Sequence, residues 1–212
     1  MSIVIYLGGN GPELFPADID INHISKVIAA DSGIELAQKH GVKVDCLIGD
    51  MDSASEEAIE KAQKDGVEIF LFNRDKDLTD FELAIEEAKK YEADELIIIG
   101  GGGQRTDHLI SNLAVLAGET TARYKVGAYF ENEIIKVCRE NQPYELELEV
   151  GTQFSLVPIN GKAIGVTSTG TKWDLTDATL EPSSALGISN AALADKITVQ
   201  ITGGTLLVFQ QI

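Results

Sequence analysis

The chain has 212 residues, 44% of them hydrophobic, which is enough for one large domain or for a medium domain beside a small one. Its formal net charge of −17 argues against nucleic acid and anionic membranes as partners, since both require a basic protein surface. The first residues, MSIVIYLGGNG, have neither the basic segment nor the length of a signal peptide or membrane span. We therefore expect a cytoplasmic protein in which Cys46 and Cys138 are buried free thiols.

Six short apolar runs follow one another through the first two thirds of the chain, each separated from the next by polar or helical sequence. The runs are continuous rather than alternating, as is typical of parallel strands that are covered on both faces. They occupy residues 3–9, 26–31, 45–50, 68–73, 95–100 and 124–130.

Helical patterns with recognisable ends lie between these runs. Ser53 and Glu56 have capping-box spacing before a helix that Gly66 ends, and Thr79 and Glu82 repeat the same spacing. A third helical pattern runs from residue 107 to residue 118. Alternating strands and helices predict an open, mostly parallel α/β sheet with right-handed crossovers.

The pattern changes after about residue 140, where helical periodicity disappears. Short strand-like segments, separated by Gly, Asn, Pro and Ser, then continue to the end of the sequence. This pattern predicts a smaller, antiparallel β-sandwich domain. We place the α/β domain at residues 1–140 and the sandwich at residues 141–212, although no linker-like composition marks the boundary between 132 and 144.

Acidic residues and glycines gather where the predicted parallel strands end. Ligands bind beyond the carboxyl ends of the strands in open α/β sheets, so these residues share one edge of the domain. Taken strand by strand, they are Gly8, Gly9, Asn10 and Gly11; Asp31; Asp50 and Asp52; Asp75, Asp77, Thr79 and Asp80; and the loop from Gly100 to His108.

Each of these residues has a structural explanation when taken alone. Ser53 and Thr79 serve equally well as helix caps, and Asp80 as a favourable charge in a first helical turn. Several carboxylates at one edge, however, repel one another by about 4 kcal/mol for each pair at 4 Å and an effective dielectric near 20. A divalent cation turns that cost into binding. Oxygen ligands without a Cys or His cluster favour Mg²⁺, held together with substrate phosphates.

Four sequence motifs in the first domain resemble those of the thiamin pyrophosphokinase family, in the order of that family. AADSG (29–33) resembles Ala-Asp-Gly-Gly, and IGDMDS (48–53) resembles Gly-Asp-Phe-Asp-Ser. DKDLTDFELAI (75–85) and GGGGQRTDHLISNL (100–113) resemble its Lys-Asp-x-Thr-Asp-x-Glu and Gly-x-x-Gly-Gly-Arg-x-Asp-His segments. In the second domain, STGTKWDL (168–175) and GISN (187–190) resemble the thiamine-binding strands.

The resemblance implies an enzyme that moves the terminal pyrophosphate of ATP to the thiamine hydroxyl and releases AMP. It implies Mg²⁺ as cofactor and a homodimer whose active sites are shared between chains. By position, the implied magnesium ligands and catalytic acids are Asp50, Asp52 and Asp80, with Asp107 as a further catalytic residue that orients Arg105 or the reacting groups. Asp80 or Asp107 would accept the proton of the thiamine hydroxyl. The implied ATP-binding residues are Asp31, Asp77, Thr79, Gly103, Arg105 and His108, and the implied thiamine-binding residues are Trp173, Ser189 and Asn190.

Three residues depart from the family pattern. Ser32 and Gln104 replace glycines, and Thr171 stands where an apolar residue is usual.

Two other functions remain open. DMDSA resembles the nucleophile loop of haloacid-dehalogenase-like phosphatases, although Ala54 occupies the Thr position of that loop. A sensor that binds a nucleotide or thiamine without catalysis would use the same scaffold.

Overall fold

The computed structural model describes residues 1–75, 77–103, 105–140 and 143–211. The chain forms two compact units, one of residues 1–115 and 120–132 and the other of residues 116–119 and 133–212. The longer segment of the second unit starts at Glu133, which is the first residue of a strand that pairs within that unit.

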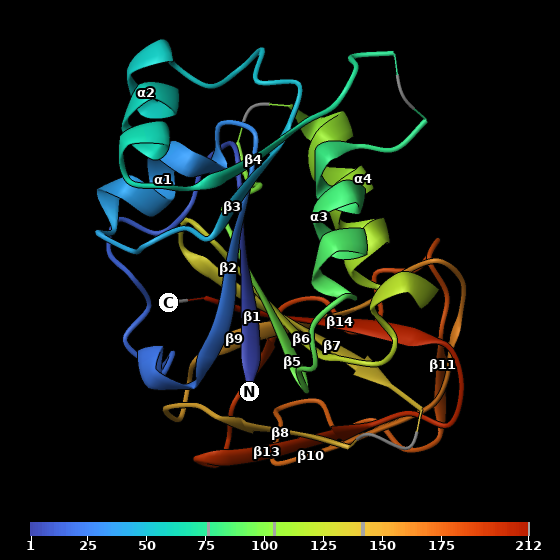
Figure 1. Ribbon diagram of the computed structural model, residues 1–212. Coiled ribbons are helices and arrows are strands. Elements are labelled where there is room, and N and C mark those ends of the chain that lie inside the picture. Colours follow the sequence, from blue (N-terminus) through green and yellow to red (C-terminus); the bar gives the residue numbers. More distant parts are fainter. Residues whose placement is uncertain (76, 104, 141–142, 212) are drawn as a thin grey trace. The chain divides into compact units, whose positions relative to one another are not determined.

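The first unit is built on a parallel sheet with the strand order β6-β5-β1-β2-β3-β4. Four helices flank this sheet, with α1 and α2 on one side and α3 and α4 on the other (Figure 1). The predicted parallel α/β sheet is thus confirmed. The strands are β1 (Ser2–Leu7), β2 (Ile24–Ala30), β3 (Cys46–Gly49), β4 (Glu68–Leu71), β5 (Glu95–Ile99) and β6 (Lys125–Phe130). The helices are α1 (Gly33–Lys39), α2 (Glu56–Lys64), α3 (Asp80–Ala88) and α4 (Thr106–Leu116), with 3₁₀ turns η1 (Ile21–His23) and η2 (Glu119–Thr121).

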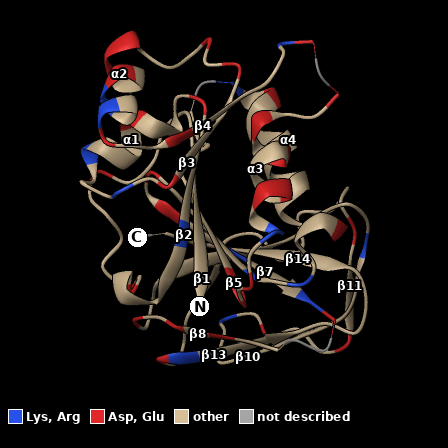
Figure 2. Ribbon diagram, in the orientation of Figure 1, with Lys and Arg blue, Asp and Glu red and all other residues tan. Residues whose placement is uncertain are grey.

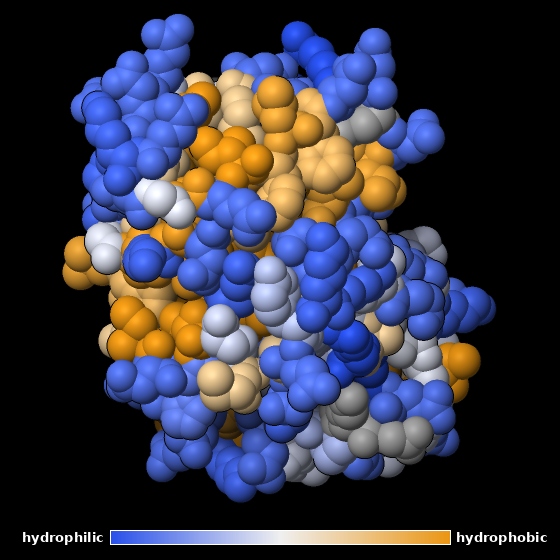
Figure 3. Space-filling view, viewed as in Figure 1, coloured by the Kyte–Doolittle hydropathy of each residue, from blue (hydrophilic) through white to orange (hydrophobic). Residues whose placement is uncertain are grey.

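Strand β4 is an exception to the prediction that these strands are covered on both faces. It forms the open edge of the sheet, and Leu71 is 71% exposed. Phe72 and Leu78 of the following loop are also exposed. Figure 3 shows hydrophobic side chains gathered in the upper part of the view, where Figure 1 draws β4 and this loop. A continuous apolar run therefore identified the strand correctly but not its position in the sheet.

The helix ends agree with the sequence at one predicted cap and differ at the other. Thr79 caps α3 in a complete capping box with Glu82. Helix α2, in contrast, is capped by Ser55, whose side chain accepts from the amide of Ala58. The prediction that Ser53 caps α2 was wrong, because the hydroxyl of Ser53 is directed to the carboxylate of Asp31.

The second unit consists of two antiparallel sheets with the strand orders β12-β9-β14-β7 and β11-β10-β13-β8. Alternate side chains from both sheets form one buried core, which includes Phe154, Leu156 and Val199. The predicted β-sandwich is therefore confirmed. Its strands are β7 (Glu133–Arg139), β8 (Tyr144–Glu147), β9 (Gln153–Pro158), β10 (Ala163–Thr169), β11 (Ala178–Leu180), β12 (Asn190–Ala191), β13 (Lys196–Gln200) and β14 (Thr205–Gln211).

The two cysteines are buried and free, as predicted. Within the part of the chain that the structure describes, no helix is long and apolar enough to cross a membrane. Acidic residues are spread over helices α2 and α3 as well as the connecting loops (Figure 2). The acids at the carboxyl ends of the strands are therefore only part of the large negative charge.

Candidate active site

A cavity of ≈ 780 Å³ opens at the carboxyl ends of the parallel strands in the first unit. The loops after β1, β2, β3, β4 and β5 all contribute to its wall, as expected for an open α/β sheet. Nine predicted site residues line it: Asp31, Asp50, Asp52, Asp77, Thr79, Asp80, Gly103, Arg105 and His108. Asp107 is not among the described lining residues, and Gln104 lies outside the described residues.

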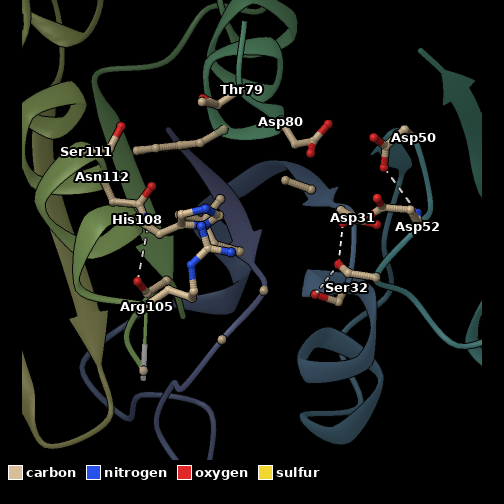
Figure 4. A pocket seen from close by; sticks show the side chains of 18 of the residues that line it. Asp31, Ser32, Asp50, Asp52, Thr79, Asp80, Arg105, His108, Ser111 and Asn112 are labelled. Atoms are coloured by element: carbon tan, nitrogen blue, oxygen red, sulfur yellow. Dashed lines mark hydrogen bonds between the residues drawn. The ribbon is translucent and has the colours of Figure 1, made fainter. Parts of the chain in front are cut away.

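Three carboxylates lie together on one side of this cavity. Asp31, Asp50 and Asp52 each offer an oxygen, and these oxygens lie within 4.8 Å of one another (Figure 4). A tight turn after β3 brings two of them together: Met51 has a φ of 61°, and the amide of Asp52 donates to Oδ1 of Asp50 at 3.1 Å. Strands β2 and β3 are neighbours in the sheet, so the acid after one lies beside the acids after the other.

Asp31 is partly buried at the end of β2. One carboxylate oxygen, Oδ2, accepts a hydrogen bond from the hydroxyl of Ser53, whereas the buried Oδ1 has no hydrogen-bond partner among the described residues. Burial raises the pKa of the Asp31 carboxyl, the Ser53 hydrogen bond opposes this rise, and the charges of Asp80, Asp50 and Asp52 add to it. Asp31 is therefore close enough to Asp50, Asp52 and Asp80 for their negative charges to disfavour its ionised form.

Asp80 enters the cavity from the first turn of α3. Gly49, the last residue of β3, has a φ of 146° and leaves the space that this carboxylate uses. A Cβ atom at Gly49 would lie 3.0 Å from Oδ1 of Asp80 and 3.2 Å from Cβ of Asp31. Asp80 therefore lies over the end of β3, beside Asp31. The carboxylate oxygens that lie within 4.8 Å of one another belong to Asp31, Asp50 and Asp52.

Nitrogen-bearing side chains face the acids from the start of α4. Arg105 and His108 point into the cavity opposite Asp31 and Asp52 (Figure 4). Arg105 donates to Asp107 through Nε at 3.1 Å and through Nη2 at 2.8 Å. This paired hydrogen bond holds the pKa of the Asp107 carboxyl well below its usual range. The arrangement agrees with Asp107 orienting Arg105, and it makes Asp107 a poor proton acceptor.

The glycine-rich loops after β1 and β5 are joined to each other. The amide of Asn10 donates to the carbonyl of Gly102 at 2.8 Å, and the amide of Gly102 donates back at 3.1 Å. Gly9, with a φ of 96°, must lack a side chain here, because a Cβ atom would lie 2.2 Å from the carbonyl oxygen of Gly102. Two loops that are distant in sequence thus form one continuous wall of the cavity.

Several functional candidates escaped sequence reasoning. Arg74 lines the cavity and forms an ion pair with Asp52, with 3.1 Å between Nη2 and Oδ2. Ser111 and Asn112 line the opposite wall, one turn after His108 (Figure 4). The spacing from His108 to Ser111 and Asn112 is one helical turn, which places all three on one face of α4 and was the available signal. No comparable signal identifies Arg74, because its position depends on a loop.

Comparisons with known proteins identify the family. The family model of the thiamin pyrophosphokinase catalytic domain matches residues 20–127. The model of the thiamin pyrophosphokinase vitamin B1 binding domain matches residues 135–206. This chain belongs to the thiamin pyrophosphokinase family. The family is one of enzymes that use ATP, and the resemblance seen in the sequence motifs is confirmed.

Individual family members agree with this assignment. The chain is 24% identical over 184 residues to the thiamine pyrophosphokinase of Bacillus subtilis, a match that covers 86% of each chain. It is 26% identical over 174 residues to thiamine pyrophosphokinase 1 of Arabidopsis thaliana, covering 78% of this chain and 64% of that relative. The crystal structure of the Bacillus subtilis thiamine pyrophosphokinase superposes with a TM-score of 0.85 at 25% identity, covering 100% of this chain and 99% of that one.

The candidate thiamine residues lie in the vitamin B1 binding domain of this thiamin pyrophosphokinase family member. Trp173 is 55% exposed, so it does not belong to the core of the sandwich. The Asn190 side chain is buried: its Oδ1 accepts from the Trp173 amide at 3.1 Å, and its Nδ2 donates to the Trp173 carbonyl at 2.9 Å. Asn190 thus fixes the backbone that presents the indole. The Nζ of Lys172 lies 4.5 Å from the centre of the indole ring.

Ser189 and Thr171 have different roles in this domain. Ser189 has a φ of 58°, its amide donates to the Ser155 hydroxyl at 3.0 Å, and it lines a second cavity of ≈ 400 Å³. The described lining of that cavity does not include Trp173. Thr171 is buried, and its hydroxyl donates to Oδ1 of Asp174 at 2.9 Å. This bond explains how a polar residue is accommodated at a position where an apolar one is usual.

Proposed function

We propose that this chain transfers the pyrophosphoryl group of ATP to the hydroxyl of thiamine, giving thiamine diphosphate and AMP, with Mg²⁺ as cofactor. The observation that carries this proposal is the cavity of the catalytic domain, where three carboxylates lie within 4.8 Å of one another and face Arg105 and His108. Such a pairing of negative and positive walls suits a metal-bound polyphosphate.

The residues on the acidic wall fit a magnesium ion. All candidate ligands are oxygens, and the buried Oδ1 of Asp31 has no hydrogen-bond partner among the described residues. Asp31, Asp50 and Asp52 would hold the ion, with Asp80 beside them. When bound, magnesium would neutralise charge on the phosphate oxygens and on the AMP leaving group.

The opposite wall would bind and orient the phosphates. The bidentate contact with Asp107 fixes the plane of the Arg105 guanidinium while leaving other N–H groups to donate to phosphate oxygens. Thr79 is engaged by Glu82, so it contributes mainly by fixing the start of α3, from which Asp80 extends. Arg105 stabilises the ionised form of Asp107 and lowers its pKa, so Asp107 is a weak base. Asp80 is then the better acceptor for the proton of the thiamine hydroxyl.

In the B1 binding domain, the exposed indole of Trp173 would stack on the flat, cationic thiamine. The position of Lys172 supports this role, because a cation already lies 4.5 Å from the centre of the ring. Asn190 would hold the indole in place through the Trp173 backbone, and Ser189 would line the adjoining surface.

One assay tests the proposed reaction against its two alternatives. Protein, ATP, Mg²⁺ and thiamine are incubated, and the nucleotides and thiamine products are separated by chromatography. Equal amounts of AMP and thiamine diphosphate support the proposal, and Asp50→Asn should abolish both. Phosphate release with a trappable aspartyl phosphate would instead support the phosphohydrolase. Binding without AMP formation would support the sensor.

We also propose that the protein is a cytoplasmic homodimer whose active sites use the acids of one chain and the thiamine residues of the other. Asp80→Asn and Trp173→Ala test this when they are unfolded together and refolded. Because random pairing makes about half of the dimers mixed, and one site in each mixed dimer then carries neither substitution, activity should return to about a quarter of the wild-type value. An activity equal to the average of the two variants, with mixed dimers verified by mass spectrometry, would refute shared sites.

A further inference from the structure

Arg74 contacts the acid cluster directly. Its Nη2 lies 3.1 Å from Oδ2 of Asp52, which is one of the three carboxylates placed to bind a cation. Both side chains line the cavity, and both are accessible to solvent, with 79% of Arg74 and 44% of Asp52 exposed. The guanidinium therefore partly neutralises the group that the proposed metal requires.

The loop that carries Arg74 is defined on both sides. Before it, the amide of Phe72 donates to the carbonyl of Gly49 at 2.9 Å, which ties the loop to the end of β3. The side chain of Asn73 then accepts from the amide of Asp75 at 3.0 Å in an Asx turn with Arg74 at its centre. After it, the Thr79 capping box fixes the start of α3. The backbone thus places Arg74 at the cavity, while its side chain stays largely exposed to solvent.

Arg74 and Arg105 differ in the carboxylates with which they pair. Both arginines line the cavity, and its described lining also includes five aspartates: Asp31, Asp50, Asp52, Asp77 and Asp80. Arg105 is held by Asp107 through two hydrogen bonds, whereas the ion pair that Arg74 forms among the described residues is an exposed one with Asp52, a member of the acid cluster. An exposed ion pair of this kind is weak and exchanges easily with another partner.

We infer that Arg74 is an exchangeable counterion that makes the site select the metal–nucleotide complex over the free divalent cation. This inference rests on the proposed function. Without nucleotide, the guanidinium occupies Asp52 and opposes the entry of a divalent cation. When the cation arrives bound to a polyphosphate, the guanidinium leaves Asp52 and pairs with phosphate oxygens, for which its planar fork is well suited. Arg74 thus weakens one form of metal binding and strengthens the other.

The test measures both forms of binding without turnover. Manganese(II) serves as the probe, because its free concentration is read directly by electron paramagnetic resonance. Titrations are carried out with Mn²⁺ alone and with Mn²⁺ bound to α,β-methylene-ATP, whose α–β bond is not cleaved. The variants are Arg74→Gln, Arg74→Lys and a control, Lys64→Gln. The control removes the same charge from an exposed ion pair, in which Nζ lies 3.4 Å from Oε2 of Glu60, on α2 outside the described cavity lining.

Opposite changes are expected in Arg74→Gln. Relative to Lys64→Gln, it should bind free Mn²⁺ about two- to fivefold more tightly and the Mn²⁺–nucleotide complex about two- to fivefold more weakly. Arg74→Lys should lie between Arg74→Gln and the wild type in both titrations, because it keeps the charge and loses the fork. Two affinities that change in the same direction, or that both match the control, would overturn the inference.

Failure of the proposed function gives a different result. If the wild-type protein forms no AMP from ATP and thiamine while the two Mn²⁺ affinities still change in opposite directions, the reaction is wrong and the counterion role stands. If AMP forms and the two affinities do not diverge, the reaction stands and the role of Arg74 is refuted.

Discussion

Replacing Asp31 by asparagine should stabilise the protein when divalent cations are absent. The substitution removes one charge from a cluster whose three ligand oxygens lie within 4.8 Å of one another. Asparagine tolerates the backbone φ of 48° at this position and retains an oxygen that can accept from the Ser53 hydroxyl. Asp31→Asn therefore removes the charge of this side chain and leaves its shape nearly unchanged.

The magnitude follows from the separation of the charges. At 4.8 Å, one carboxylate pair repels by about 3.5 kcal/mol at an effective dielectric of 20 and by about 0.9 kcal/mol in water. Asp52 is 44% exposed, so the interaction lies closer to the value in water. Since Asp31 loses its repulsion with two neighbours, Asp31→Asn should raise the free energy of unfolding by about 1–2 kcal/mol.

Urea denaturation in EDTA and in Mg²⁺ measures this effect. In EDTA, Asp31→Asn should unfold at the higher urea concentration. In Mg²⁺, the wild type should gain about 2.7 kcal/mol when the ion is present at 100 times its dissociation constant, and the variant should gain much less. The order of stability should therefore reverse. A variant that is less stable than the wild type in EDTA would contradict the electrostatic reasoning.

The pH dependence in EDTA provides a second check. Because the pKa of Asp31 is raised on folding, this residue favours the folded state below its unfolded value of 3.8 and opposes it above the folded value. The advantage of Asp31→Asn should hence be largest at neutral pH and disappear as the pH falls towards 3.8. Asp20→Asn is the control of opposite sign, because hydrogen bonds from the Asn22 amide and from His23 lower the pKa of Asp20. It should be less stable than the wild type at neutral pH, and that deficit should shrink at acid pH.

Two further predictions concern the cavity and the indole. Gly49→Ala should destabilise the protein by about 1–3 kcal/mol and weaken Mn²⁺ binding. Its Cβ atom would lie 3.0 Å from Oδ1 of Asp80, and the backbone φ of 146° disfavours a side chain at this position. Urea and Mn²⁺ titrations that match those of the wild type would show that the alanine does not crowd Asp80. Saturating thiamine should quench the emission of Trp173, the only tryptophan, and Trp173→Ala should cost about 1–2 kcal/mol of thiamine affinity. An unchanged spectrum, with binding established by calorimetry, would refute stacking.

The sequence predicted the parts of the fold that depend on local pattern and missed those that depend on tertiary contacts. Continuous apolar runs predict the parallel strands because burial on both faces requires them, as in β1, which is buried throughout. Helix α1 is absent from the predicted helices, since it has only seven residues and no side-chain cap bond at Ser32. Strand β7 lies in the stretch where the composition marks no boundary, and its pairing with β14 joins residues far apart in the chain.

The same distinction applies to the site. Asp31, Asp50 and Asp52 could be predicted to converge, because the ends of neighbouring parallel strands must be close in space. The pairing of Arg74 with Asp52 could not be predicted, because it depends on the path of the loop after β4. The contrast between Ser53 and Ser55 has a similar origin. Both precede α2, and the position of Asp31, at the end of the neighbouring strand β2, decides which hydroxyl is drawn away from the helix.

The departure from the family pattern at Ser32 has a physical explanation in the residue that faces it. A Cβ atom at Gly8 would lie 2.2 Å from Oγ of Ser32, so this serine fits only because position 8 has no side chain. The Oγ atoms of Ser32 and Ser53 lie 3.1 Å apart, within hydrogen-bond distance, and the Ser53 hydroxyl donates to Oδ2 of Asp31. Ser32 therefore joins the hydrogen-bonded group on the acidic wall instead of crowding the cavity. It follows that Ser32→Gly and Gly8→Ala should both leave Asp31 its contact with Ser53, the first by removing the Ser32 hydroxyl and the second by displacing only that hydroxyl.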